Sequence, residues 1–248
     1  MSEKPTIVLV PGAWSKPFFY EKLQSSLADR GFQSETHAHP SIGAEPPTKT
    51  LDDDVSALRG VIARLCDAGK RIVVVAHSYG GIVSSSAVEG LGKEERNSEG
   101  KIGGVIEIIY MVAFVVPKGQ SLISASGGQL LPWIKTEGNY ASCTIGPEGA
   151  FHDLLKADRE KWNAALTHTS LPVFSGISSY EPWKTIPTTY VLGEEDQMLP
   201  LAIQEYMVQM LGTKHTYRLK SSHHPFLSMP DTVAEIIEES SVRQNRNV

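Results

Sequence analysis

The sequence is poor in cysteine, in long apolar runs and in positive charge, and each shortage excludes a class of protein. Its two cysteines, Cys66 and Cys143, are too few for a disulfide framework and lack the spacing of metal ligands. No run of about 18 apolar residues is present, so we expect neither a membrane span nor a membrane partner. The net charge of −5, without a basic stripe, argues against a nucleic-acid partner.

The start of the chain and its thiols bear on where the protein resides. Residues 1–5 lead directly into an apolar strand pattern and show none of the features of a signal peptide. Two cysteines without a pairing pattern are typical of reduced thiols, so we expect a cytoplasmic protein. The 248 residues suffice to bury a large core, in one α/β domain or in two smaller ones.

The stretch 72–81 carries the strongest local signal in the chain. Four β-branched apolar residues predict a buried strand, and the small residues that follow predict a helix packed closely on a sheet. The turn between them, AHSYG at 76–80, has small residues two places before and two places after Ser78. This pattern is typical of a nucleophile elbow, in which a strained backbone holds the serine hydroxyl clear of the sheet. A structural serine in a glycine-rich turn is the alternative at this point.

Strand and helix patterns alternate through most of the chain. Besides the strand at 72–77, strands are expected at 6–10, 33–39, 104–116, 188–192 and 215–219, and helices at 17–31, 50–69, 201–211 and 231–239. This alternation predicts a doubly wound, mainly parallel six-stranded sheet. In the helix at 50–69, three aspartates at 52–54 favour a first turn stabilised by the helix dipole over a metal site.

Residues 117–185 break the alternation and carry scattered tryptophan and phenylalanine. We expect them to form an inserted, mostly helical cap over an apolar pocket, with one helix at 151–166. The α/β core would then comprise 1–116 and 186–248. A surface excursion without a role in the site is the alternative.

A serine nucleophile needs a base within hydrogen-bond reach, and the base needs an orienting acid. Ligands bind beyond the carboxyl ends of the strands in such a sheet, where the residues after 192 and after 219 are expected to lie. In the required order the candidates are Ser78, then Glu194, Glu195 or Asp196, and then His223 or His224. The residues alone leave the choice of acid and base open.

The loop after the first strand, PGAW at 11–14, suits an oxyanion hole. It lacks G-x-G-x-x-G, which excludes a dinucleotide site, and no other segment implies a cofactor or a metal. We expect the backbone N–H groups of Ala13 and Tyr79 to stabilise the oxyanion. The residues expected to contact substrate are Gly12, Trp14, His77, Trp133 and His224.

With these residues in place, nearly the whole chain resembles the α/β-hydrolase superfamily. The resemblance is greatest to small cofactor-free methylesterases and hydroxynitrile lyases and their microbial relatives. The matching segments are the strand and loop at 8–14 and the elbow at 76–81. Two spacings also match: Asp196 lies four places before a proline, and His223 lies seven places before another proline. These spacings in the family imply Asp196 as the acid and His223 as the base.

Two departures from the family bear on the reaction. Many relatives have His-Gly where this chain has Pro11 and Gly12. The lyases carry a threonine in the oxyanion loop and a lysine after the base, where this chain has Gly12 and His224. The resemblance with these departures implies an esterase rather than a cyanohydrin lyase.

We therefore expect a serine hydrolase with a Ser-His-Asp triad that cleaves a small, fairly apolar carboxylic ester or lactone through an acyl-enzyme. A lyase or another C–C bond-cleaving or rearranging enzyme of specialised metabolism on the same triad is the alternative. A ligand-binding receptor that keeps the hydrolase fold is a third hypothesis. The expected partner is a small-molecule substrate, and the sequence leaves open whether the chain forms a homodimer.

Overall fold

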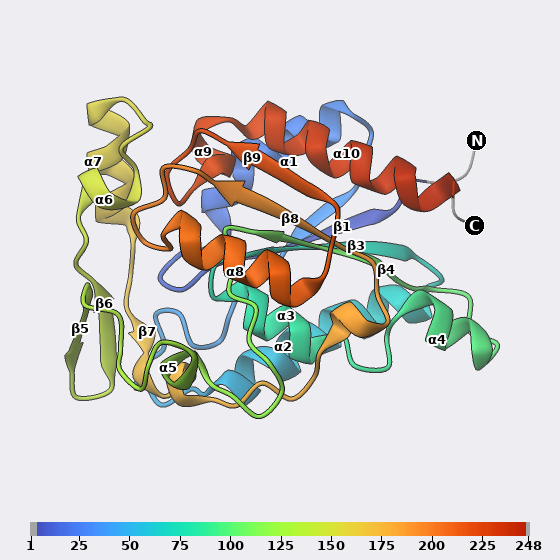
Figure 1. Cartoon of the computed structure of the whole chain (residues 1–248), viewed down its shortest axis with the longest axis horizontal. Coiled ribbons are helices and arrows are strands. Elements are labelled where there is room, and N and C mark those ends of the chain that lie inside the picture. Colours follow the sequence, from blue (N-terminus) through green and yellow to red (C-terminus); the bar gives the residue numbers. More distant parts are fainter. Residues whose placement is uncertain (1–3, 247–248) are drawn as a thin grey trace.

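The computed structural model describes residues 4–246 and contains a six-stranded sheet with helices on both faces (Figure 1). The strand order is β2-β1-β3-β4-β8-β9, and every pairing is parallel. The strands are β1 (Thr6–Val10), β2 (Ser34–Thr36), β3 (Arg71–His77), β4 (Gly104–Met111), β8 (Thr188–Gly193) and β9 (Thr216–Leu219). The predicted doubly wound sheet is confirmed. The start of the chain, where we expect no signal peptide, lies at residues 1–3 outside the described part.

The central strands are buried along their whole length, which explains their continuous apolar sequences. Every residue of β1 and of β4 is buried. β1 pairs with β3 so that Val10 lies opposite Ala76, and β3 pairs with β4 so that His77 lies opposite Met111. The loops after these three strands therefore meet around the residue that follows His77.

Two expected strands are shorter than their apolar patterns. The pattern at 33–39 yields only β2 at the edge of the sheet, and that at 104–116 stops at Met111. Val112 takes a positive φ of 42°, which turns the chain out of the strand. Burial continues beyond the strand, so the sequence alone does not mark this end.

Helices cover the two faces of the sheet (Figure 1). One face carries α1 (Glu21–Asp29) and α10 (Pro230–Arg246), and the other carries α2 (Leu51–Asp67), α3 (Gly80–Ala87) and α8 (Leu201–Leu211). Shorter helices are η1 (Pro17–Tyr20), α4 (Lys93–Ser98) and α9 (Pro225–Ser228). The last helix continues past the expected end at 239 and ends at Arg246.

The segment between β4 and β8, residues 112–187, is called the insertion below. Its helices are α5 (Leu122–Ala125), α6 (Pro147–Ala150), α7 (Lys156–Ala165), η2 (Leu171–Ser175) and η3 (Pro182–Lys184). It also contains an antiparallel sheet of β5 (Ile134–Glu137), β6 (Tyr140–Cys143) and β7 (Thr169–Ser170), which the sequence analysis did not foresee. The helix expected at 151–166 begins only at Lys156. Most of the insertion lies beyond one end of the large sheet (Figure 1).

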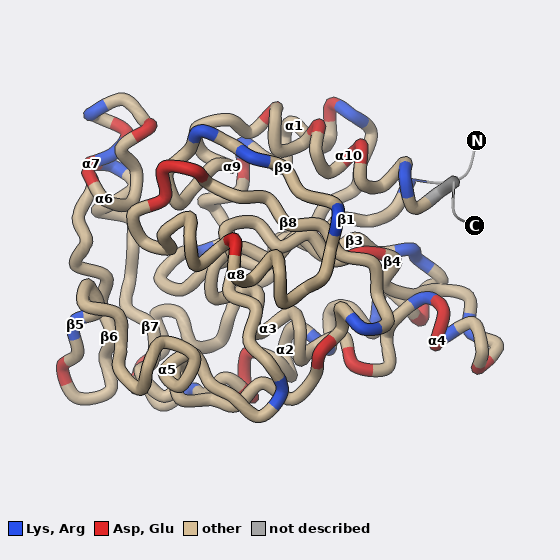
Figure 2. The backbone as a smooth tube through the Cα atoms, viewed as in Figure 1, with Lys and Arg blue, Asp and Glu red and all other residues tan. Residues whose placement is uncertain are grey.

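Charged residues of both signs are interspersed along the backbone, and no basic stripe is visible in this view (Figure 2). Within residues 4–246, no helix combines the length and the apolar composition needed to cross a membrane.

Candidate active site

Ser78 occupies the turn between β3 and α3 in a conformation that few side chains adopt. Its φ is 51°, in the left-handed region, and its carbonyl oxygen accepts the N–H groups of Gly81 and Phe114, both at 3.0 Å. A Cβ atom on Gly80 would come within 2.5 Å of the Pro11 carbonyl oxygen, and one on Gly81 would overlap the Phe114 carbonyl. The elbow is strained and lies too close to two neighbouring loops to accept side chains there, as its sequence pattern predicts.

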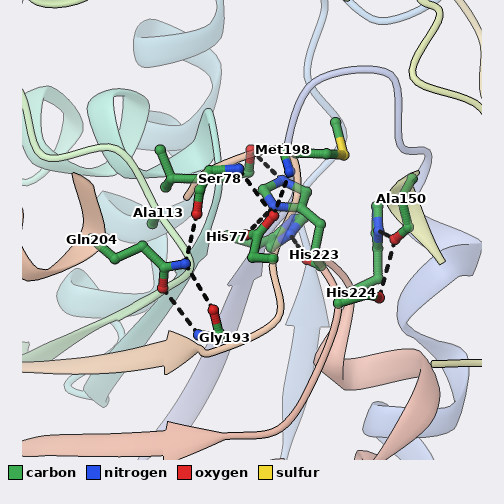
Figure 3. Close-up of polar contacts among 12 residues, drawn as sticks. His77, Ser78, Ala113, Ala150, Gly193, Met198, Gln204, His223 and His224 are labelled. Atoms are coloured by element: carbon green, nitrogen blue, oxygen red, sulfur yellow. Dashed lines mark hydrogen bonds and ion pairs between the residues drawn. The ribbon is translucent and has the colours of Figure 1, made fainter. Parts of the chain in front are cut away.

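Ser78, His223 and Asp196 form a continuous hydrogen-bond chain (Figure 3). The Ser78 Oγ lies 2.8 Å from His223 Nε2, and His223 Nδ1 lies 2.7 Å from Asp196 Oδ2. A carboxylate can only accept, so Nδ1 carries the hydrogen and Nε2 is left to accept the serine proton. The arrangement can generate a serine nucleophile and a general base.

The two glutamates that the residues alone left open as the acid lie elsewhere. Glu194 Oε1 lies 3.6 Å from Arg218 Nη1, and Glu195 Oε2 lies 3.6 Å from His152 Nε2. Asp196 instead points inward, and its second oxygen, Oδ1, accepts the N–H groups of Met198 (2.7 Å) and Leu199 (2.9 Å). The geometry thus singles out Asp196.

Gln204 fixes the loop that carries Asp196, and the sequence analysis missed it. Its fully buried amide on α8 bonds both the N–H and the carbonyl oxygen of Gly193 at 3.0 Å, and the Leu199 carbonyl oxygen at 2.7 Å (Figure 3). These three bonds close the loop at both of its ends. A glutamine on the buried face of an amphipathic helix is the signal that could have identified it.

The loop at 11–14 is held by the insertion. Trp14 has a φ of 66°, its backbone N–H donates to Thr169 Oγ1, and its indole N–H donates to the Ala141 carbonyl oxygen, both at 2.9 Å. In the described part of the chain, the backbone N–H groups of Ala13 and Tyr79 donate to no acceptor. Both residues line the pocket beside Ser78, where these donors could bind an oxyanion.

The three aspartates at 52–54 have different environments. Asp53 forms a capping box with Thr50, as expected at a helix start. Asp54 is fully buried and accepts hydrogen bonds from the Tyr79 hydroxyl (2.7 Å) and from the N–H and hydroxyl of Ser41 (2.9 and 2.6 Å). Burial raises the pKa of Asp54. This carboxyl group therefore also anchors the residue that follows the elbow serine, a role that the helix-dipole interpretation did not include.

A narrow, apolar pocket opens beside Ser78. The space in it that protein atoms do not fill is about 390 Å³, part of which is open to solvent. None of its lining side chains is charged; they belong to Ala13, Trp14, Ser78, Tyr79, Phe114, Leu122, Ile123, Ser126, Gln129, Leu130, Leu131, Trp133, Ile134 and Phe174. Two of the five expected substrate contacts, Trp14 and Trp133, are among them.

The other three expected substrate contacts do not line this pocket. His77 Nε2 bonds the carbonyl oxygen of His223 at 2.8 Å, and Gly12 packs directly against the His77 ring. His224 Nδ1 bonds the Ala150 carbonyl oxygen at 3.1 Å, and its ring stacks on Phe151. Burial lowers the pKa of both His77 and His224. Gly12, His77 and His224 therefore lie behind the triad and do not face the pocket.

Gly12→Ala is expected to lower kcat about 100-fold, the loss typical of a missing oxyanion donor. The added Cβ would lie 2.8 Å from His77 Nδ1 and 2.9 Å from the Ser78 Cβ, so the loop with the Ala13 N–H must move away. Steady-state kinetics measure the loss. The control is Gly60→Ala on the exposed face of α2, where nothing lies within 4 Å of the new atom and kcat should not change. An unchanged kcat in Gly12→Ala would contradict this placement of the loop.

Metal ligands are not gathered anywhere in residues 4–246: no three His, Cys, Asp or Glu side chains lie close enough together to hold an ion.

Comparison with known proteins places the chain in a family. The profile described as the alpha/beta hydrolase family matches residues 7–236. One relative, the alpha/beta hydrolase nvfD of Aspergillus novofumigatus, is 32% identical over 96% of this chain and 97% of its own length. A pyrethroid hydrolase from Sphingobium faniae has a similar structure, with a TM-score of 0.76 at 20% identity over 96% of this chain and 97% of that one. Polyneuridine aldehyde esterase gives a TM-score of 0.75 at 20% identity over 96% and 99%. The chain belongs to the alpha/beta hydrolase family.

Proposed function

We propose that this protein is a serine esterase that cleaves a small, fairly apolar carboxylic ester or lactone through an acyl-enzyme. The observation that carries the proposal is the chain of hydrogen bonds from Ser78 through His223 to Asp196. Ser78, at the start of this chain, lines a pocket without charged side chains. The names of the similar proteins, which are hydrolases and an esterase, agree with this reaction class.

The mechanism follows from the atoms that face one another. The Ser78 Oγ attacks the carbonyl carbon of the ester while His223 Nε2 takes the hydroxyl proton. The developing oxyanion accepts the backbone N–H groups of Ala13 and Tyr79. His223 then returns its proton to the departing alcohol, which leaves an acyl group on Ser78. Asp196 stabilises the imidazolium and fixes the orientation of its ring.

Hydrolysis of the acyl-enzyme repeats these steps with water as the nucleophile. His223 Nε2 takes a proton from the water that attacks the acyl carbonyl, and the same two N–H groups bind the second oxyanion. Collapse releases the acid, and His223 returns the proton to Ser78. One acid and one alcohol are formed for each ester cleaved.

We propose that the insertion serves as a cap that selects the substrate. Most of the pocket wall comes from it, including Trp133 and Phe174. Trp14 packs against both of these rings, with centroids 5.4 and 5.8 Å away. An aromatic wall without a charged partner favours neutral groups, because a charged group would lose its hydration without compensation.

A series of p-nitrophenyl esters tests this function. We expect kcat/KM to rise from acetyl to butyryl by up to about fourfold per methylene, since each buried methylene contributes about 0.8 kcal/mol. A hemisuccinate ester, which carries a carboxylate, should be at least about 100-fold poorer than the butyrate. Acid and alcohol should form in equal amounts. Absence of hydrolysis across the series and across simple lactones, or unequal products, would contradict the proposal.

A further inference from the structure

The residue before His223 is held by the insertion and not by the sheet. The Ser222 backbone N–H donates to Asp153 Oδ2 at 3.0 Å, and the Ser222 hydroxyl donates to Asp153 Oδ1 at 2.5 Å. Both oxygens of one carboxylate thus bind one fully buried residue. Hydrogen bonds to a charged acceptor are shorter and stronger than neutral ones, so this contact fixes the backbone next to the base.

The residue after His223 is held by the same part of the insertion. His224 Nδ1 donates to the carbonyl oxygen of Ala150, and the His224 ring stacks on Phe151 at a centroid distance of 4.4 Å. Figure 3 shows this side chain turned toward Ala150 and away from Ser78. Residues 150–153 therefore hold both neighbours of His223 in the chain, Ser222 and His224.

The position of the His223 ring depends on these contacts of residues 150–153 with Ser222 and His224. The ring must stay 2.8 Å from the Ser78 Oγ and 2.7 Å from the Asp196 carboxylate, and a general base acts only within such reach. Within residues 4–246, the carbonyl oxygen of His223 accepts a hydrogen bond from His77 Nε2 and from no other group. A displacement of about 1 Å in a reacting group can cost about 100-fold in rate.

We propose that Asp153 is a positioning residue for the base. Its carboxylate holds Ser222 and thereby sets the His223 imidazole against Ser78 and Asp196, so that the insertion takes part in aligning the triad. The inference rests on the proposed esterase function, because its kinetic effect is read through hydrolysis at Ser78.

Asp153→Ala is expected to lower kcat about 10- to 100-fold with KM changed less than about twofold. Asp153→Asn should give a smaller loss, because its amide oxygen can still accept a hydrogen bond from one of the two Ser222 donors. The matched control is Glu148→Ala in α6, which removes an exposed ion pair with Arg159. This control should leave kcat unchanged.

A second comparison separates positioning from a merely structural contact. In a His223→Ala background, removal of the Asp153 carboxylate should not reduce the residual rate further, because the group that it positions is gone. An equal further loss in that background would overturn the proposal. So would an unchanged kcat in Asp153→Ala itself.

A measurement without turnover keeps this inference distinct from the proposed function. The ring ¹⁵N resonances of His223 should shift in Asp153→Ala and stay in place in Glu148→Ala. If the wild type hydrolysed no ester, the proposed function would fail, and these resonances would still decide the role of Asp153. Unchanged His223 resonances would overturn it.

Discussion

Replacing Ser78 with alanine should lower kcat for the best ester roughly 10⁵- to 10⁶-fold, the loss seen when a triad serine is removed. The variant lacks only the Oγ, which is hydrogen-bonded to His223 Nε2. The oxyanion donors and the apolar pocket remain, so binding of the uncleaved ester should change little. Steady-state kinetics and a binding titration measure the two effects separately.

Ser84→Ala provides the matched control for this prediction. Ser84 lies on α3 and, like every residue of that helix, is buried. Its hydroxyl has no hydrogen-bond partner in the described residues. Removing that hydroxyl should leave kcat unchanged and cost no stability, because an unpaired buried polar group contributes none. Turnover by Ser78→Ala at the wild-type rate, with purity established, would exclude Ser78 as the nucleophile.

The second large effect is a loss of stability in mild acid. Burial lowers the pKa of four buried histidines below the ordinary value of 6.5: to about 4 for His37 and His39, and well below 6.5 for His77 and His224. In the unfolded chain each returns to about 6.5. Below that pH the unfolded chain binds protons that the folded chain does not. The free energy of unfolding therefore falls as the pH is lowered from 6.5 toward 4.

The magnitude depends on two carboxyl groups with the opposite sign. Each proton taken up on unfolding changes the free energy of unfolding by about 1.4 kcal/mol per pH unit. Burial raises the pKa of Asp54 and Glu107, which bind protons in the folded state and offset part of the histidine effect. Each carboxyl group can offset at most about one proton, so we expect the four histidines to give a net uptake of at least about two protons near pH 5, or roughly 3 kcal/mol per pH unit or more.

Urea unfolding between pH 7.5 and 4.5 measures this slope. His37→Asn should flatten it by about one proton, since one histidine with a lowered pKa is lost. A free energy of unfolding that is constant or rises toward pH 4.5 would contradict the lowered pKa values.

The sequence predicted the parts of the site that depend on local patterns. The elbow around Ser78 follows from small residues at fixed spacing, because the strand and helix must pass close together there. The parallel sheet follows from its apolar strands. The choice of Asp196 and His223 needed the family resemblance, since two glutamates and a second histidine stand next to them in the chain. Which of these side chains points inward is decided only by tertiary packing.

The parts that were missed depend on contacts between distant residues. The bond from Ser222 to Asp153 joins residues 69 positions apart, and that from Tyr79 to Asp54 joins residues 25 apart. No local periodicity marks either partner. The strands β5 and β6 have four residues each and carry polar side chains, so they give no strand pattern of useful length.

The central claim is that Ser78 carries the acyl group during turnover. The most direct test is a rapid-quench experiment with p-nitrophenyl butyrate, followed by mass spectrometry of the intact protein and of its peptides. We expect a burst of at most one p-nitrophenolate per chain and a single butyryl group on Ser78, absent in Ser78→Ala. An acyl group on another residue, or steady hydrolysis in which Ser78 is never acylated and fluorophosphonate does not label it, would contradict it.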